Sequence, residues 1–334
     1  MRYTAGMASR ELDDMQIATI VIPNLNGMRY LGPCLESLTR QTRRDFSVIL
    51  IDNGSQDESV EFVRLHFPEV TVRRFETNKG FCAAVNEGIR LSMTPYVILL
   101  NNDTVCEETF VEELVRAMEE GPADLFSCAA KMVQMDMPDR MDNAGDYYCA
   151  LGWAFARGKG KPAADYDREC GIFSSCAAAA IYRRDVFDEI GLFDETHFAY
   201  LEDLDIGYRA RIAGYRNEYA PKAAVRHVGS ATSGSVYNAF KVRYSSRNNL
   251  YLIYKNMPWA QIIFNLPLLL PGFLIKMVFF AAKGFLREYV SGLIEGLSCC
   301  RREKKVRFQW KYSGAYIRIQ LALWVNLFRR FTDF

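Results

Sequence analysis

Residues 96–103, with the sequence YVILLNND, decide the fold class of this chain. Tyr96 to Leu100 is an apolar run as long as one buried strand, and Asp103 follows it after two asparagines. In open α/β sheets, ligands bind at the carboxyl ends of the strands. A carboxylate there is a hard oxygen ligand that suits Mg²⁺ or Mn²⁺ carrying a diphosphate. The stretch therefore predicts a metal and diphosphate site at the edge of a sheet.

Strand-like and helix-like segments alternate along the first 120 residues, with the strands about 25 residues apart. Strands are expected at 17–22, 46–51, 70–75 and 96–100, and the helices between them are followed by one more at 107–120. This order predicts parallel βαβ units whose sheet is covered on both faces. No G-x-G-x-x-G motif opens the first helix, which removes the main support for a nicotinamide-binding domain.

The region 125–181 is less regular, with an apolar run at 125–130 (LFSCAA) and a hairpin-like stretch around 147–155. Helices are then expected at 185–190 and 200–213, with a short edge strand at 219–225. Residues 174–181 (SSCAAAAI) carry small side chains. Such residues either let a ligand approach closely or pack tightly in a strand or helix, and both interpretations stay open.

The net charge of +1 hides a large difference between two parts of the chain. Residues 241–334 contain 16 Lys and Arg against 4 Asp and Glu, a net charge of +12. The rest of the chain contains 25 basic and 36 acidic residues, a net charge of −11. A basic tail is typical of contact with anionic lipid or nucleic acid, and the apolar content of this tail favours lipid.

The basic tail has features of a membrane-associated helical region. Residues 256–275 carry no charge and are long enough to cross a bilayer. Pro258, Pro267 and Pro271 interrupt this span and lysines flank it, which favours helices lying in the membrane interface, as do the segments 279–297 and 316–331. A bilayer span, a soluble helical subdomain and a dimerisation surface are the alternatives.

The nine cysteines show neither metal-ligand spacing nor a paired framework, which favours reduced thiols in a cytosolic compartment. Residues 1–16 contain no apolar core segment, so we expect a loose N-terminal extension rather than a secretory signal.

Six short motifs follow one another between residues 17 and 230. They are VIPNLN at 21–26, IDNGSQD at 51–57, NKGF at 78–81 with Asn86, LLNND at 99–103, YLEDLD at 200–205 and VRH at 225–227. Each is degenerate alone, but in this order they resemble the family 2 glycosyltransferases with the GT-A fold. The chain is most similar to the bacterial rhamnosyltransferase-like subgroup, whose tail resembles the region after RNNL at 247–250.

The resemblance implies an α/β fold of the GT-A type, with a Rossmann-like, mostly parallel central sheet. The expected division is an extension at 1–16, a catalytic domain at 17–240 and a basic, apolar helical membrane-associating region at 241–334. The implied activity is an inverting, metal-dependent sugar transfer at the cytoplasmic face of the cell membrane, within cell-surface glycan synthesis.

The implied donor is a nucleotide-diphospho-sugar, with dTDP-L-rhamnose as first choice and a UDP-sugar as second. The implied acceptor is a polyprenyl-diphosphate-linked saccharide or a growing polysaccharide. Membrane lipid is the further expected partner, nucleic acid is not expected, and a homo-oligomer stays open.

By resemblance, the donor nucleotide is bound by residues of the first four motifs. They are Pro23, Asn24, Asn26, Asp52, Asn78, Lys79, Gly80, Asn102 and Asp103. Asp52 is expected at the pyrimidine base or the ribose, although an aspartate in this turn also suits a helix cap. Lys79 is expected at phosphate, with a solvated surface charge as the alternative.

The chemistry is assigned to the last two motifs together with Asp103. Asp203 is the expected general base that deprotonates the acceptor hydroxyl. Glu202 and Asp205 have secondary roles, either near the acceptor or in orienting basic groups and capping the helix. Asp103 and His227 are the expected ligands of Mg²⁺ or Mn²⁺, although Asn101 stands where the family often has a first aspartate.

Two other classes of function compete with this one. A catalytically inactive nucleotide-binding scaffold at the membrane would need none of these acids. A nucleotidyltransferase would want a glycine-rich and basic triphosphate loop near the first strand, and residues 23–27 (PNLNG) do not supply one.

Overall fold

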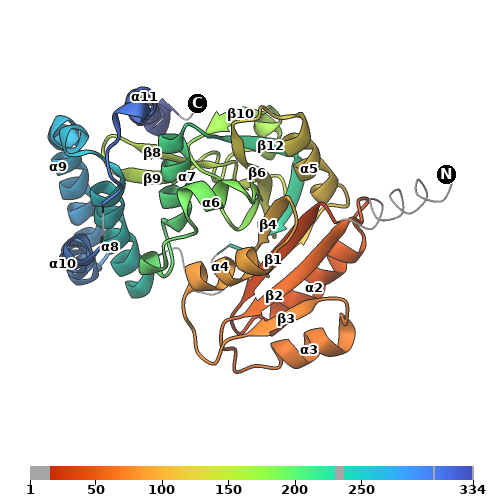
Figure 1. Cartoon of the computed structure of the whole chain (residues 1–334). Coiled ribbons are helices and arrows are strands. Elements are labelled where there is room, and N and C mark those ends of the chain that lie inside the picture. Colours follow the sequence, from red (N-terminus) through yellow and green to blue (C-terminus); the bar gives the residue numbers. More distant parts are fainter. Residues whose placement is uncertain (1–15, 230–236, 304, 333–334) are drawn as a thin grey trace.

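The computed structural model describes residues 16–229, 237–303 and 305–332, so nearly all of the expected N-terminal extension lies outside the described residues. A central sheet crosses the molecule between helices on both faces, and a layer of four helices flanks it at one side (Figure 1). The sheet order is β10-β12-β6-β11-β4-β1-β2-β3, with β5 paired to β12 and β7 paired to β6.

The first half of the sheet follows the predicted βαβ order. Its elements are β1 (Ala18–Asn24), α2 (Met28–Thr39), β2 (Phe46–Asp52), α3 (Ser59–His66), β3 (Thr71–Arg74), α4 (Phe81–Leu91) and β4 (Tyr96–Leu100). β1 pairs in parallel with β2 and β4, and β2 pairs in parallel with β3. The carboxyl ends of these strands therefore meet at one edge, as predicted.

Buried side chains of β1 show how the sheet is covered on both faces. Ile20 and Ile22 belong to a core that includes apolar residues of α2 and α5, whereas Val21 belongs to a core with apolar residues of α4 and α7. All three are fully buried. Side chains alternate between the faces of a strand, so an unbroken apolar run requires helices on both sides.

The second half of the sheet is mixed. Its elements are β5 (Thr104–Cys106), α5 (Phe110–Glu120), β6 (Leu125–Gln134), β7 (Met141–Asn143), β8 (Asp146–Cys149), β9 (Trp153–Ala156), β10 (Cys170–Ile172), β11 (Ala179–Arg183), α6 (Val186–Ile190), α7 (Glu202–Ala213) and β12 (Arg216–His227). β11 is antiparallel to both β4 and β6, and β12 is parallel to β6. The small residues 174–181 thus lead into a tightly packed strand.

The expected edge strand at 219–225 was wrong in length and place. β12 lies between β6 on one side and β10 and β5 on the other. Its pairing with β6 shifts between Ala220 and Ala224, around Pro221. Proline has no N–H for the ladder, and the irregularity at this point lets the strand continue past it.

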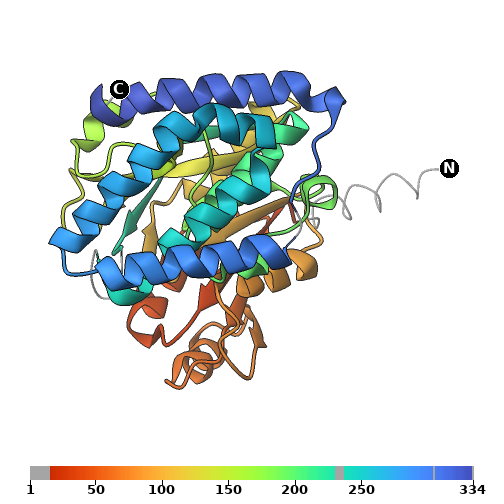
Figure 2. The ribbon, with the colours of Figure 1, turned by 90° about the vertical axis from the view of Figure 1, so that its left-hand side faces the viewer.

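Four helices form the layer that faces the viewer in Figure 2: α8 (Ala239–Asn256), α9 (Trp259–Ala282), α10 (Leu286–Arg302) and α11 (Ser313–Thr332). α8, α9 and α11 share a hydrophobic core with β6, with α7 and with the hairpin β8–β9, whereas α10 packs on α8 and α9. Pro267 and Pro271 lie inside α9 and do not end it. Instead, the chain breaks after α9 at Gly284, whose φ of +81° favours glycine.

The surface of the helical layer is strongly apolar. By length and composition, α9 alone among the described helices could cross a membrane. Its exposed side chains include Ile263 (68%), Phe264 (60%) and Val278 (70%). α11 exposes Phe328 in the same way. Contiguous apolar surface of this kind is typical of contact with a membrane or with another protein.

Candidate active site

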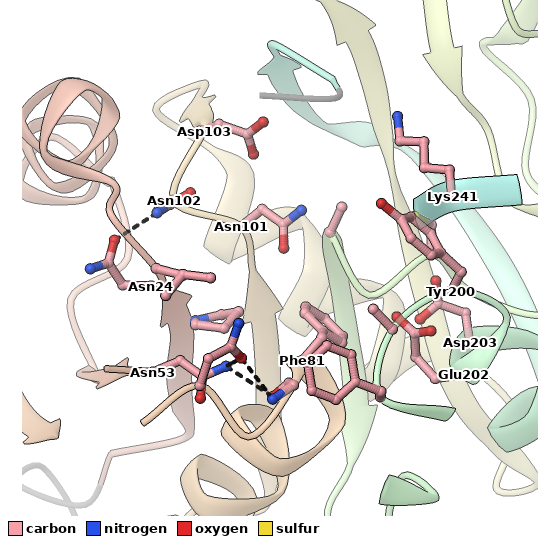
Figure 3. A pocket seen from close by; sticks show the side chains of 18 of the residues that line it. Asn24, Asn53, Phe81, Asn101, Asn102, Asp103, Tyr200, Glu202, Asp203 and Lys241 are labelled. Atoms are coloured by element: carbon pink, nitrogen blue, oxygen red, sulfur yellow. Dashed lines mark hydrogen bonds between the residues drawn. The ribbon is translucent and has the colours of Figure 1, made fainter. Parts of the chain in front are cut away.

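A pocket of about 420 Å³ lies at the carboxyl ends of β1, β2 and β4 (Figure 3). It is closed on the far side by the loop before α7 and by the start of α8. Its lining residues are Pro23, Asn24, Leu25, Asn53, Asn78, Gly80, Phe81, Asn101, Asn102, Asp103, Cys176, Ala178, Phe198, Ala199, Tyr200, Glu202, Asp203, His227, Phe240 and Lys241. The pocket therefore combines strand-end residues from the first half of the chain with acids from the second half.

One wall of the pocket carries a carboxylate and a histidine in contact. β5 follows Asp103 directly and pairs with the end of β12, which brings Asp103 beside His227. His227 Nε2 lies 3.3 Å from Asp103 Oδ1, and His227 Nδ1 lies 2.8 Å from Asp142 Oδ2. Asp142 in turn accepts a hydrogen bond from Lys159 at 3.0 Å.

This arrangement fits a divalent cation. Asp103 and His227 both line the pocket, while Asp142 contacts the other ring nitrogen of His227, as a carboxylate commonly does behind a metal-binding histidine. Burial lowers the pKa of His227, but hydrogen bonds with Asp103 and Asp142 outweigh it and raise the pKa to about 9. A cation at Nε2 would compete with that proton.

The opposite wall carries Glu202 and Asp203, which begin α7. Phe198, Tyr200 and Leu201 just before them have φ values of 61°, 72° and 66°, a left-handed conformation that is costly for such side chains. Asn248 of α8 compensates through its side-chain amide, which donates to the carbonyls of residues 197, 199 and 200 at 2.9, 2.8 and 2.7 Å. The loop before α7, held in this conformation, therefore places Glu202 and Asp203 at the pocket.

The environment of Asp203 favours its protonated form. Asp203 Oδ1 accepts a hydrogen bond from Ala177 N at 3.1 Å. Burial raises the pKa of Asp203 well above its usual value, and Glu202 and Asp146 raise it further. Burial likewise raises the pKa of Glu202 to about 7. A carboxylate with a raised pKa is a stronger base, as proton abstraction from a hydroxyl requires.

The profile of the family described as "Glycosyl transferase family 2" matches residues 19–191, which is more than half of the chain. The chain belongs to this family. It is therefore a glycosyltransferase, and the GT-A-like mixed α/β fold agrees with the expectation from the motifs.

Named relatives are found among bacterial enzymes. The chain is 30% identical over 196 residues to a PGL/p-HBAD biosynthesis glycosyltransferase of Mycobacterium bovis, covering 57% of this chain and 68% of the relative. It is 27% identical over 233 residues to an N-acetylglucosaminyl-diphospho-decaprenol L-rhamnosyltransferase of Mycobacterium tuberculosis, covering 61% of this chain and 74% of the relative.

Solved structures share the fold at low sequence identity. Residues 1–349 of S. aureus TarS in complex with UDP-GlcNAc superpose with a TM-score of 0.58 at 15% identity, covering 92% of this chain and 91% of that one. GalNAc-T7 with UDP, GalNAc and Mn²⁺ gives 0.57 at 16% identity, covering 72% of this chain. This chain spans about half the length of the GalNAc-T7 chain, 48%.

Most of the residues predicted for this glycosyltransferase's site line one pocket. Those brought together are Pro23, Asn24, Asn78, Gly80, Asn102, Asp103, Glu202, Asp203 and His227. Gly80 has a φ of +89°, and a Cβ there would lie 2.5 Å from the Phe198 ring. Because Gly80 and Phe198 approach so closely, the loop of residues 78–80 packs against the loop before α7.

Three of the expected donor residues do not line the pocket. Asp52 is fully buried, where it accepts hydrogen bonds from Asn24 Nδ2 and Ser55 N, each at 3.1 Å. Asn26 Oδ1 accepts from Gln56 N at 2.8 Å. Lys79 is exposed and its ammonium lies 4.6 Å from the centre of the Phe75 ring. Of the three, Asp52 contacts a residue of the lining, Asn24.

Asp205 does not line the pocket. It is fully buried and accepts hydrogen bonds from Arg209 Nε and Lys255 Nζ, each at 2.9 Å. Its other oxygen accepts from Asn256 at 2.9 Å. The alternative expectation, that this residue orients basic groups, describes these contacts.

The predicted site residues leave out several that the structure brings to the pocket or next to its residues. Asn53 and Asn101 line the pocket and lie within two of the quoted motifs. Asp142 contacts His227 and Asp146 approaches Asp203, and both come from the irregular region, where no pattern indicated such partners. Phe240 lines the pocket from α8, one residue before the region that was expected to be helical.

Proposed function

We propose that this family 2 enzyme is an inverting, metal-dependent glycosyltransferase with a nucleotide-diphospho-sugar donor. The first choice of donor is dTDP-L-rhamnose, and a UDP-sugar is the second. The acceptor is a lipid-linked or polysaccharide glycan of the bacterial cell surface. One observation carries the proposal: the Asp103–His227 pair and the Asp203 carboxylate line the same pocket from different walls.

Asp203 supplies the base of the reaction. Its carboxylate accepts the proton of the acceptor hydroxyl while that oxygen attacks the anomeric carbon of the donor sugar. The bond from this carbon to the nucleotide diphosphate breaks with its electron pair on the diphosphate oxygen. One displacement from the opposite face inverts the configuration at the anomeric carbon.

Asp103 and His227 would hold the divalent cation, which when bound stabilises negative charge on the leaving diphosphate. Asp142 fixes the orientation of the His227 ring through Nδ1. The remaining donor contacts come from neutral amides. Asn24, Asn53, Asn78, Asn101 and Asn102 line the pocket. Such side chains offer both donors and acceptors to a nucleoside and its ribose.

The helical layer and one relative support the proposed acceptor and a location at the membrane. The layer combines exposed apolar side chains of α9 and α11 with a net charge of +12 over residues 241–334. Basic, apolar surface suits the anionic cytoplasmic face of a membrane. The M. tuberculosis relative is named for a decaprenol-linked acceptor and L-rhamnose, which supports the same choice here.

The test separates catalysis from donor binding in Asp203→Asn, which keeps the shape of the side chain but removes its basicity. We expect sugar transfer to fall by at least about 100-fold, because general base catalysis contributes roughly that much, while nucleotide binding stays within about twofold. Asp188→Asn, an exposed acid on α6 that is ion-paired only to Arg184, is the matched control and should transfer normally.

Three outcomes would contradict the proposal. Undiminished transfer by Asp203→Asn removes this residue from the role of base. Loss of nucleotide binding in the folded variant assigns it to donor binding instead. A wild-type protein that binds nucleotide but transfers no sugar from any tested donor supports the inactive scaffold.

A further inference from the structure

A second large cavity, of about 470 Å³, lies between the hairpin β8–β9 and the helical layer. Aromatic side chains form much of its wall, with Trp153 and Phe155 from the hairpin and Phe279 and Phe280 from α9. Lys276 of α9 and Arg330 of α11 also line it, and none of its lining residues is acidic.

A smaller cavity of about 220 Å³ lies between this space and the active site. It shares Asp203 with the donor pocket. It shares Ala154, Phe155 and Leu201 with the cavity under the helices. Three spaces therefore follow one another from the strand ends, past the proposed base, to the helical layer. A molecule that lies along them would present one end to Asp203 and the other to α9.

Lys276 and Arg330 form a cationic pair at the helical end of this route. Within residues 16–229, 237–303 and 305–332, neither side chain forms an ion pair, and Arg330 only stacks 5.7 Å from the centre of the Phe155 ring. Burial lowers the pKa of Lys276 to about 8, and Arg330 is close enough to lower it as well. Lys276 is partly buried and Arg330 is exposed, so an anion that enters the cavity would find two positively charged partners there.

The cavity also continues onto apolar surface. Ile275 and Phe279 line it, and yet 51% and 40% of their surface is exposed. Leu274 and Val278, next to them on α9, are 55% and 70% exposed. An elongated apolar group leaving the cavity would find a continuous apolar face along α9.

We propose that this cavity binds the diphosphate and first isoprene units of a prenyl-diphosphate-linked acceptor saccharide. Lys276 and Arg330 bind the diphosphate, the prenyl chain follows the exposed face of α9, and the saccharide extends past Phe155 and Leu201 to Asp203. This inference rests on the proposed transfer function. It specifies a lipid-linked saccharide, rather than a polysaccharide, as the acceptor.

Binding of farnesyl diphosphate to the full chain, measured by calorimetry, tests the site without any donor or catalysis. We expect Lys276→Gln and Arg330→Gln each to weaken this binding by at least about tenfold, since a charge-assisted hydrogen bond contributes about that much. Lys276→Arg should retain it. Arg301→Gln, which removes an exposed charge on α10 outside the cavity, is the matched control and should bind as the wild type.

Two further probes separate the parts of the ligand. Farnesol and inorganic pyrophosphate should each bind more weakly than farnesyl diphosphate, because each offers only half of the recognised groups. Pyrophosphate binding as tight as that of farnesyl diphosphate would reduce the cavity to an anion site and overturn the proposal. Unchanged affinity for farnesyl diphosphate in both glutamine variants would overturn it too.

Ala156→Leu tests the route to Asp203, because Ala156 lines the small cavity but neither the donor pocket nor the cavity under the helices, and a larger side chain there would fill the small cavity. Transfer to a prenyl-diphosphate-linked saccharide should fall at least about tenfold, while binding of nucleotide and of farnesyl diphosphate stays unchanged. Normal transfer by this variant would contradict the route.

The two proposals fail in different ways. If nucleotide binds and Asp203→Asn loses transfer, but farnesyl diphosphate does not bind, only the acceptor cavity is wrong. If farnesyl diphosphate binds as predicted but no nucleotide does, the proposed transfer function is wrong.

Discussion

Lys255 of α8 lies 2.9 Å from Asp205, two residues after the proposed base Asp203. The same ammonium lies 2.6 Å from Asp194, and both Lys255 and Asp205 are buried. Asn248, two turns earlier on α8, holds the carbonyls of the loop before α7. Helix α8 therefore fixes the start of α7 from two points, and the geometry of the catalytic wall depends on it.

Lys255→Met should destabilise the fold by about 3 kcal/mol, because the partly buried Asp194 would lose its cation and the buried Asp205 would lose one of two, with Arg209 still in place. Guanidinium unfolding of the variant and the wild type measures the change. Lys311→Met, which removes an exposed lysine, is the control and should cost less than about 1 kcal/mol. A loss of less than about 1 kcal/mol in Lys255→Met would show that the position of α8 does not depend on this ion pair.

The same cluster predicts a dependence of stability on pH. Burial raises the pKa of Asp194, but Lys255 outweighs it and lowers the pKa to about 2. A carboxyl with a lowered folded-state pKa stabilises the fold above its unfolded value near 4, and this contribution disappears as the pH falls towards 2. The difference in unfolding free energy between wild type and Asp194→Asn should therefore shrink between about pH 4 and 2. A difference that stays constant over this range would contradict the assignment.

Asp146→Asn should move the acid limb of the activity profile to lower pH. Asp146, Asp203 and Cys176 place their ligand atoms within 4.8 Å of one another, and the negative charge of Asp146 helps to raise the pKa of Asp203. Removing that charge lowers the pKa of the base, which then ionises at lower pH. The measurement is kcat/KM against pH, with the exposed Asp165→Asn as control. A limb that stays in place or moves upward would contradict the coupling.

Asp142→Asn should weaken the binding of Mn²⁺ by about 10–100-fold, the usual effect of losing a carboxylate behind a metal-bound histidine. The side chain holds His227 Nδ1 at 2.8 Å without lining the pocket. Titration of nucleotide-bound protein with Mn²⁺ measures the change. Asp139→Asn, a nearby exposed acid, should bind Mn²⁺ as the wild type does. Equal Mn²⁺ affinity of Asp142→Asn and the wild type would show that metal binding does not depend on the contact of Asp142 with His227.

Polar substitutions on α9 should reduce membrane binding without unfolding the protein. The triple change of Ile263, Leu274 and Val278 to Gln replaces side chains that are at least half exposed and leaves the shared core intact. Sedimentation with anionic vesicles should show less bound protein, because apolar area is lost from the membrane-facing surface. Undiminished vesicle binding by the folded variant would remove α9 from the interface.

The sequence predicted those parts of the site that lie at strand ends. The apolar run before Asp103 indicated its place, the resemblance assigned His227 beside it, and the pairing of β5 with β12 brings the two together. Asp142, Asp146 and Asn248 were not predicted, because their contacts depend on hairpins and a helix that are joined to the site only by tertiary packing. The two roles expected for Asp205 could not be separated from the sequence, because its partner Lys255 comes beside it only once α8 lies against α7.

The most direct test of the central claim is calorimetric binding of dTDP, UDP and GDP to the purified protein, with and without Mn²⁺ or Mg²⁺, repeated with His227→Ala. We predict that dTDP, or failing that UDP, binds in the presence of the divalent cation. Removing the cation or the His227 ring should weaken this binding by at least about tenfold. A folded protein that binds no nucleotide, or binds one equally well without the cation and without His227, would contradict the account.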